Sequence, residues 1–317
     1  MATNPIIYAT DYNGIQTKVQ TVLGTYYGQS VNSSAISTPV TNQNATNITA
    51  LQWQKLYTDL LICYNHQNAS NGSLTYPTTT TVIALADLTA YQNMGTSILS
   101  NYLQFNSGYK SSQSFTSQTV GPGWGINNSS NTVKHTLVLT FPNAASAGYF
   151  FNSGGSILFS ASMSGGQTAV AGTKDFSWNS MLSHMGVIQF SAGGCTTQAG
   201  ALTPGTGYLG FYSLTASNQL VYQKLTENAT YSPNQLDIYA NFSGSTLSFA
   251  IEYEDRSGPS DGIHNQYNVD EAVTGTLTSN ASMSYASGGP TGFTMNVTSY
   301  LPTASTNSVA VIASPSP

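Results

Sequence analysis

The stretch TLSFAIEYE, residues 246–254, has large apolar side chains at every second position. Leu247, Phe249, Ile251 and Tyr253 share one side of an extended chain, and the other side carries Ser248, Ala250, Glu252 and Glu254. Because successive side chains of a strand point to opposite faces, this alternation predicts a half-buried β-strand.

Three other stretches show the same period of two: HTLVLTF (135–141), SILFSASM (156–163) and LDIYANF (236–242). Many such strands with one polar face predict an antiparallel β-sandwich, which we place at residues 113–317. The stretch WNSMLSHMG (178–186) breaks the alternation and predicts a short helix that covers one end of the sandwich. No repeat of fixed period occurs, which argues against a β-helix or a repetitive fibre shaft.

Before residue 113 the apolar residues follow a helical period instead. The stretches that carry it are DYNGIQTKVQTVLG (11–24), TALQWQKLYTDLLICYNHQ (49–67) and IALADLTAYQNMGTSILSNYLQF (83–105). Asp11 and Thr49 are candidate N-caps, and Gly24 is the expected end of the first helix. The predicted fold class is therefore α+β. Residues 1–112 form a three-helix region for attachment and oligomerisation, and residues 113–317 form the sandwich.

The segment GYFFNSGG, residues 148–155, sets three consecutive aromatic residues before a glycine pair. Three neighbours cannot all point inward in a strand, and the glycine pair favours a tight turn. We interpret the segment as a loop in which two aromatic side chains seal the sandwich edge and one faces a neighbouring molecule. It predicts an element of shape and not a binding site.

The composition limits the possible partners. Charged residues make up only 6% of the chain, against roughly a quarter in an average soluble domain. A polar but nearly uncharged surface is typical of assembly proteins and extracellular fibres. With a net charge of −5, the chain lacks the cationic footprint that nucleic acids or a membrane surface need. No apolar run is long enough to span a membrane, and the N-terminal residues lack the pattern of a secretory signal, so we expect synthesis in a cytosol.

No pattern of catalytic or metal-binding residues occurs in the sequence. The histidines, His66, His135, His184 and His264, have no second ligand at metal-binding spacing. Cys63 and Cys195 are expected to be reduced, unpaired thiols. Nucleophile-elbow and phosphate-loop motifs do not occur, and the glycine-rich GPGWG (121–125) is interpreted as a linker. We therefore predict no catalytic, cofactor-binding or metal-binding residue, and no enzymatic activity.

One acidic segment, residues 252–271, contains six of the twelve acidic residues of the chain. They are Glu252, Glu254, Asp255, Asp261, Asp270 and Glu271. The favoured interpretation is a long solvated loop between two strands, with acidic residues at the strand ends. Oxygen ligands from such a loop could instead bind Ca²⁺, although the spacing of an EF-hand is missing. A glycosidase site built on paired carboxylates is a third interpretation, and no cleft that would place two carboxylates across a sugar is evident.

Several runs resemble a virion structural protein family of tailed bacteriophages, common in phages of cyanobacteria and marine bacteria. They are AGYFFNSGGSILFSASMSGG (147–166), FSWNSMLSHMGVIQF (176–190), FAIEYED (249–255) with VDEAVTGTLTS (269–279), and, near the N-terminus, DYNGIQTKVQTVLGTYYGQ (11–29) with LQWQKLYTDL (51–60). The resemblance spans most of the chain. It transfers no catalytic residue.

The resemblance implies a non-enzymatic structural subunit of a tailed-phage virion, at the neck or collar or in a fibre-like tail appendage. A capsid decoration protein is an alternative within the same class. A tail module that binds host polysaccharide is an alternative from another class, and a glycan-cleaving enzyme has little support. The expected partners are copies of the same chain, other neck, tail or capsid proteins and, for the second alternative, a host surface glycan. The expected location is the virion, after synthesis in the host cytoplasm.

Overall fold

The computed structural model describes residues 7–29, 36–41, 48–68, 72–125, 132–227, 231, 234–257, 272–288 and 297–312. The chain divides into two compact units. We call the first the helical unit; it comprises Met1–Ser111, Ala145–Gly155 and Tyr285–Leu301. We call the second the sandwich unit; it comprises Ser112–Ala144, Ser156–Ser284 and Pro302–Pro317. Two short segments from beyond residue 112 thus belong with the N-terminal helices.

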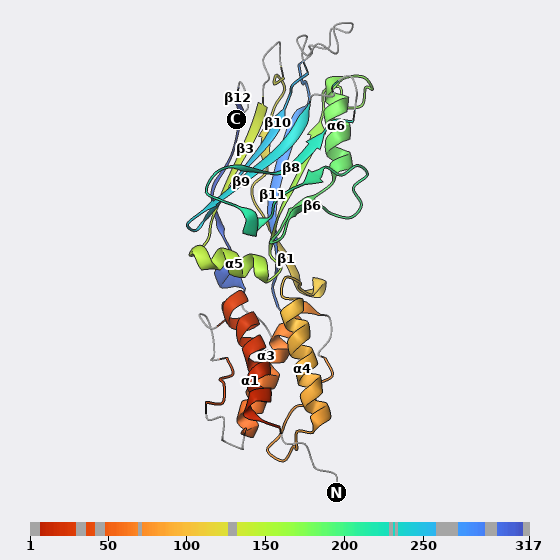
Figure 1. Cartoon of the computed structure of the whole chain (residues 1–317). Helices are drawn as coiled ribbons and strands as arrows, with labels where there is room; N and C mark the ends of the chain where they lie inside the picture. Colours follow the sequence, from red (N-terminus) through yellow and green to blue (C-terminus); the bar gives the residue numbers. More distant parts are fainter. Residues whose placement is uncertain are drawn as a thin grey trace. The chain divides into compact units, whose positions relative to one another are not determined.

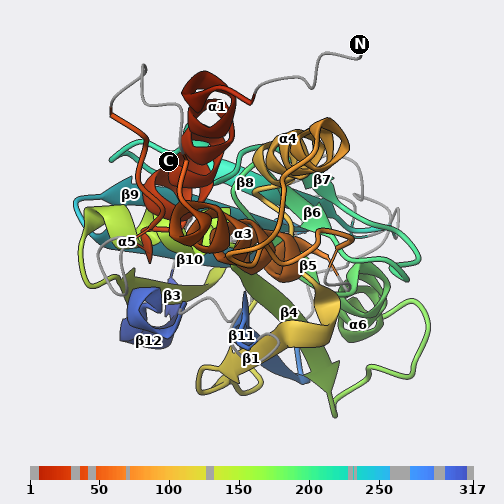
Figure 2. The same cartoon turned by 90° about the horizontal axis from the view of Figure 1, so that it is seen from below.

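The helical unit contains the three helices that the sequence predicts. They lie side by side (Figure 1 and Figure 2) and are α1 (Ala9–Val19), α3 (Ala50–Gln67) and α4 (Leu85–Ser100). The first continues without a break as a π-helix, η1 (Gln20–Tyr26), so it passes the predicted end at Gly24. It also begins before the predicted cap: Asp11 is the third helical residue, and its carboxylate accepts a hydrogen bond from the Tyr8 backbone N–H at 2.9 Å. As predicted, Thr49 caps α3.

The three helices pack around aromatic and aliphatic side chains. The Trp53 ring meets the rings of Tyr12 and Tyr91 edge to face, with centroids 5.3 and 5.1 Å apart. Such pairs add to the stabilisation that burial of the rings already provides. A Cβ on Gly95 would lie 3.5 Å from Ile15, so this glycine brings α4 close to α1.

The C-terminal ends of the same helices are joined by buried hydrogen bonds. Gln67 of α3 donates from Nε2 to the Tyr27 hydroxyl at 3.0 Å and to the Ile98 carbonyl of α4 at 2.9 Å. The Tyr27 hydroxyl donates in turn to the carbonyl of Tyr102 at 2.8 Å. Because the last turns of α1/η1, α3 and α4 meet in this network, the three helices run parallel, and their N-terminal ends lie together at the opposite end.

The interpretation of residues 148–151 as a loop at the sandwich edge is wrong. Residues Ala144–Asn152 form helix α5. Within the helical unit, the Tyr149 ring lies against Gly28, whose φ of 63° and missing Cβ leave room for it, and 5.1 Å from the ring of Tyr300. Tyr300 belongs to the short 3₁₀ helix η5 (Thr298–Tyr300). Phe150 and Phe151 also belong to the helical unit, and both side chains are buried.

The sandwich unit consists of two antiparallel sheets, and the predicted α+β fold with N-terminal helices and a β-sandwich is confirmed (Figure 1). One sheet has the order β1-β11-β4-β5-β6, with β2 paired to β11, and the other has the order β12-β3-β10-β9-β8-β7. The strands of the first sheet are β1 (Lys110–Ser114), β2 (Gln118–Val120), β4 (Ser156–Ser164), β5 (Ile188–Phe190), β6 (Cys195–Thr197) and β11 (Thr276–Ala286). Those of the second are β3 (Thr132–Thr140), β7 (Thr206–Gly207), β8 (Gln219–Leu225), β9 (Gln235–Ser243), β10 (Thr246–Glu254) and β12 (Thr303–Ile312). The 3₁₀ helices η2 (Ser107–Tyr109) and η3 (Phe211–Ser213) are short connections.

Phe249 of β10 joins the two sheets at the centre of the sandwich. Its ring lies 4.9 Å from that of Phe159 on β4 and 5.2 Å from that of Phe190 on β5. The strand pairs with β3 on one side and β9 on the other along its whole length, so it is a central strand. The alternating pattern of residues 246–254 therefore predicted the strand and its inward face correctly.

The predicted helix near residues 178–186 is α6 (Lys174–Met185), which lies against β4. Its N-cap, Thr173, accepts a hydrogen bond from the backbone N–H of Phe176. Trp178, Met181, Leu182 and Met185 are buried. Among the helices that the structure describes, none combines the length and the apolar character needed to cross a membrane.

Burial makes the stability of the helical unit depend on pH through His66. Burial lowers the pKa of His66 to about 4, and its Nε2 lies 3.0 Å from the carbonyl of Ser153. Between pH 6.5 and 4 the unfolded chain binds the proton and the folded one does not, so stability falls as pH falls. From pH 6.5 to pH 5 we expect the free energy of unfolding to fall by about 2 kcal/mol.

His66→Gln keeps an N–H donor for Ser153 and should remove that loss. Denaturant unfolding at both pH values, followed by far-ultraviolet circular dichroism, measures it. An unchanged pH dependence in this variant would show that another group is responsible.

Candidate functional site

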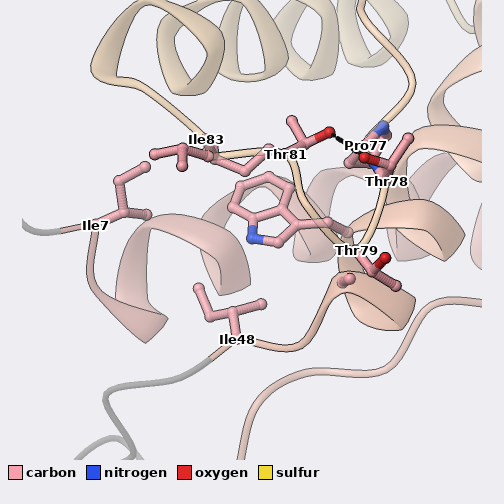
Figure 3. A pocket seen from close by; sticks show the side chains of 10 residues that line it. Ile7, Ile48, Pro77, Thr78, Thr79, Thr81 and Ile83 are labelled. Atoms are coloured by element: carbon pink, nitrogen blue, oxygen red, sulfur yellow. Dashed lines mark hydrogen bonds between the residues drawn. The ribbon is translucent and has the colours of Figure 1, made fainter.

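A hollow of about 460 Å³ opens at the N-terminal end of the helical unit (Figure 3). Seven of its ten lining residues have apolar side chains, and the lining comes from three separate segments of the chain. The lining residues are Ile7, Ile48, Ala50, Trp53, Pro77, Thr78, Thr79, Thr81, Val82 and Ile83. Most of the surface that these residues expose to the hollow is nevertheless polar, and the side-chain polar groups among them are the threonine hydroxyls and the indole N–H.

Three isoleucines reach the hollow because the three helices start in the same way. Ile7, Ile48 and Ile83 each directly precede an N-cap residue, which is Tyr8 in α1, Thr49 in α3 and Ala84 in α4. An apolar residue at this position usually packs on the fourth helical residue, an arrangement called a hydrophobic staple. The fourth residues are Tyr12, Trp53 and Leu88, and all three are buried.

The backbone N–H of each N-cap residue is satisfied by a side chain of the same helix. The Asp11 carboxylate accepts from the Tyr8 N–H at 2.9 Å, the Gln52 amide oxygen from Thr49 at 2.8 Å, and the Asp87 carboxylate from Ala84 at 2.8 Å. The first turn of a helix otherwise exposes N–H groups that need partners. These side chains therefore give one N–H of each helix start a partner within its own helix.

Large apolar side chains also project from this end into solvent. Leu51 is 74% exposed and Val82 is 85% exposed, and Tyr8 and Leu85 are more than half exposed. Leu51 and Leu85 belong to the first turns of α3 and α4, and Val82 lines the hollow itself. A clustered apolar surface of this kind usually marks an interaction site. We call the hollow and these four residues the apolar end.

The acidic segment differs from the solvated loop that the sequence suggested. Glu252 and Glu254 are only 2% and 0% exposed, and Asp255 is also buried. Each has a basic partner: Lys134 lies 2.9 Å from Glu252, Arg256 forms an ion pair with Glu254, and Lys174 lies 2.8 Å from Asp255. The sequence could not show this, since Lys134 meets Glu252 only through the register of β3 and β10. Asp261, Asp270 and Glu271 lie outside the described residues.

The outward face of β9 and β10 is therefore a buried polar layer. Asp237 of β9 stands opposite Glu252, and Gln235 stands opposite Glu254. Gln235 donates to Asp237 at 2.6 Å and to Glu254 at 3.3 Å. Burial raises the pKa of Asp237 and of Glu254, although the nearby Arg256 lowers both. In the described part of the chain, Glu252 Oε2 and Glu254 Oε1 have no hydrogen-bond partner, so this layer depends on its ion pairs.

The histidines and cysteines do not converge on one site. His66 is buried in the helical unit, and His135 is buried in the sandwich, 2.8 Å from the Ser279 hydroxyl and 2.7 Å from the Asn307 amide oxygen. His184 pairs with Glu227 at 2.8 Å, and His264 lies outside the described residues. Cys63 and Cys195 are free and buried, and burial raises the pKa of both thiols. Among the residues that the structure describes, no three His, Cys, Asp or Glu side chains are grouped so that they could hold a metal ion.

Comparison with protein-family models, with curated proteins and with solved structures found no match for this chain.

Lys134→Met tests the ion pair in the polar layer. The substitution leaves the Glu252 carboxylate buried without its basic partner, and removing one member of a buried pair costs several kcal/mol. Because Lys134 is partly exposed, we expect a smaller loss of about 2 kcal/mol in the free energy of unfolding. The double variant Lys134→Met, Glu252→Met has no unpaired carboxylate, so it should recover most of the lost free energy of unfolding. Denaturant unfolding of the two single variants and the double variant measures the coupling, and losses that simply add would contradict the pairing.

Added Ca²⁺ tests the alternative of a cation site. A divalent ion beside Glu252 and Glu254 would also lie beside Lys134 and Arg256, which repel it. We therefore expect the melting temperature to be the same in Ca²⁺ and in EDTA. An ion present at a hundred times its Kd would add about 2.7 kcal/mol of stability. A rise in melting temperature that EDTA reverses would identify a site that includes this segment.

Proposed function

We propose that the protein is a non-enzymatic structural subunit of a tailed-phage virion, at the neck or collar or in a tail appendage, and that it assembles through the apolar end. The observation that carries the assembly role is the hollow of about 460 Å³ with exposed Leu51, Val82 and Leu85 around it. The virion part of the proposal is supported by the sequence resemblance and by the nearly uncharged composition.

The distribution of charge favours contact between helical units. The residues of the helical unit include three aspartates and three lysines, so its formal net charge is zero. The whole net charge of −5 therefore belongs to the sandwich unit. Sandwich units repel each other, whereas helical units approach without such repulsion.

The partner that we propose for the apolar end is the apolar end of a second copy. Each copy has both a hollow lined in part by isoleucines and apolar side chains that project beside it, so the surface can complement itself. A symmetric dimer uses the same patch on both subunits, so such a contact gives a two-fold dimer. Other neck, tail or capsid proteins are the further partners in the particle.

Leu51→Asp tests this surface, with Leu202→Asp as a matched control. Both leucines are 74% exposed, but Leu202 belongs to the sandwich unit. Neither substitution should change the melting temperature much, since neither side chain is buried. A buried leucine contributes about 1.5 kcal/mol or more, so Leu51→Asp should weaken self-association at least about tenfold.

Sedimentation equilibrium of the full chain measures this association. If both substitutions weaken self-association equally, or if only Leu202→Asp weakens it, contacts between copies involve the sandwich unit. Point substitutions are preferable to removal of residues 1–112, because Ala145–Gly155 and Tyr285–Leu301 pack with those residues and would lose their partners.

The virion role needs a test of its own. A cryo-electron microscopy map of the particle whose genome encodes this chain should contain it at the neck, collar or tail. Density on the capsid surface would favour a decoration protein. Absence of the chain from purified particles, checked by mass spectrometry, would contradict the proposal.

Binding of a host polysaccharide remains the second candidate, because Tyr208 and Tyr212 of the sandwich unit are both about half exposed. They lie four residues apart, just after β7, and exposed aromatic rings often stack on sugars. The same unit also has a separate hollow of about 310 Å³ whose lining includes the polar side chains of Ser117, Gln198 and Asn280. Binding of host-surface polysaccharide that is lost in the Tyr208→Ala, Tyr212→Ala double variant would support this function.

A further inference from the structure

Lys174 and Asp255 form an ion pair that is closed off from solvent. Lys174 is the first residue of α6, and Asp255 directly follows β10. Their exposed fractions are 0% and 4%, and the Lys174 Nζ lies 2.8 Å from the Asp255 Oδ2. The Nζ also donates to the carbonyl oxygens of Gly125 and Ser257, each at 3.3 Å. The amine is thus held on several sides with one hydrogen directed at the carboxylate.

Three buried aromatic residues are close in the chain to this pair or to its hydrogen-bond partner Gly125. Trp178 follows Lys174 by one helical turn, and its ring lies 5.2 Å from that of Trp124 and 6.4 Å from that of Tyr253. All three rings are buried. The indole N–H groups of Trp124 and Trp178 have no hydrogen-bond partner among the described residues. Such surroundings offer little solvation to separated charges, which favours neutral products over an ion pair.

The other groups at the carboxylate are also placed for chemistry. The Ser257 hydroxyl donates to Asp255 Oδ1 at 2.9 Å, which leaves Oδ2 for Lys174. Gly125 has a φ of 71°, and a Cβ there would lie 2.2 Å from Oδ2. Only glycine allows the backbone to approach the carboxylate this closely. Burial raises the pKa of the Asp255 carboxyl, while its contacts with Lys174 lower it.

We propose that Lys174 and Asp255 condense to an intramolecular isopeptide bond. A proton first passes from Nζ to Oδ2 along their hydrogen bond, which gives a neutral amine beside a neutral carboxylic acid. The nitrogen lone pair then attacks Cγ, and the Ser257 hydroxyl stabilises the negative charge that develops on Oδ1. A second proton moves from the nitrogen to Oδ2, the Cγ–Oδ2 bond breaks, and water leaves. The amide keeps one hydrogen, and the reaction needs no oxidant, cofactor or second substrate.

The bond would connect the start of α6 to the end of the central strand β10. These residues lie 81 positions apart in the chain, so the link would close a long loop of the sandwich unit. The other ion pairs of this unit are less suited to the reaction. The amine of Lys134 is partly exposed, Glu227 beside Lys224 is also partly exposed, and the guanidinium of Arg256 is a poor nucleophile.

Mass spectrometry of the denatured full chain tests the proposal. The intact mass should be lower than the sequence mass by one water molecule. Proteolysis should then release a branched peptide that joins the segments containing Lys174 and Asp255. Mapping is essential, because cyclisation at an Asp-Gly pair such as Asp261–Gly262 also removes water. The full sequence mass after prolonged incubation at neutral pH, or a water loss mapped to another position, would overturn the proposal.

Variants separate the reaction from folding. Lys174→Arg and Asp255→Ala should have the full mass expected from their sequences, and the matched control Lys134→Arg should still lose one water. Ser257→Ala keeps the reacting pair but should form the bond about tenfold more slowly or worse, as for loss of an oxyanion donor. If the substitutions at the pair prevent folding, the branched peptide of the unmodified sequence still decides the question. Equal rates of bond formation in the unmodified sequence and in Ser257→Ala would show that the Ser257 hydroxyl has no role in the reaction.

Discussion

The sandwich unit depends on the pairing of every basic side chain that it contains. Lys134, Lys174, Lys224 and Arg256 are its basic residues, and each forms an ion pair with an acidic residue. Three of the partners, Glu252, Glu254 and Asp255, are buried at the end of β10. Isolated buried carboxylates would be very costly, so each of the three needs its basic partner. The pairing explains how a central strand can have one polar face that is nevertheless buried.

The helical unit differs from the sandwich unit because it contains few charged residues. The capping hydrogen bonds of α1, α3 and α4 stay within each helix. The three isoleucines before the N-caps converge with Trp53 at one end of the unit. The N-cap N–H groups are therefore satisfied locally, and the exposed side chains of Leu51, Val82 and Leu85 give this end an apolar surface. Such a surface gains from contact with a second apolar surface and loses little by desolvation.

The fold was predictable where one periodicity dominated a segment, as in residues 246–254 and 49–67. It was not predictable at α5, where Ala147, Phe150 and Phe151 share one helical face but were interpreted with a period of two. The burial of Glu252 could not be predicted from the sequence either. Its partner Lys134 is 118 positions earlier, and only the strand register brings the two residues together.

The apolar end could have been found from the sequence, although it was not. The three helices begin with the similar hexapeptides IYATDY (7–12), ITALQW (48–53) and IALADL (83–88). In each hexapeptide the first residue is isoleucine. The fifth residue has a side chain that can accept a hydrogen bond, and the sixth residue is large and apolar. This pattern is the signature of a capping residue with a hydrophobic staple. What it does not reveal is that the helices run parallel, which brings the three starts together.

Hydrogen exchange at low and high protein concentration tests the assembly through the apolar end most directly. Backbone amides near a contact between copies become protected as the protein associates. Protection that rises with concentration at residues 48–53 and 77–85, with the sandwich unit unchanged, is the result that our account predicts. Protection that rises along the sandwich strands instead, with the helix starts unchanged, would contradict it.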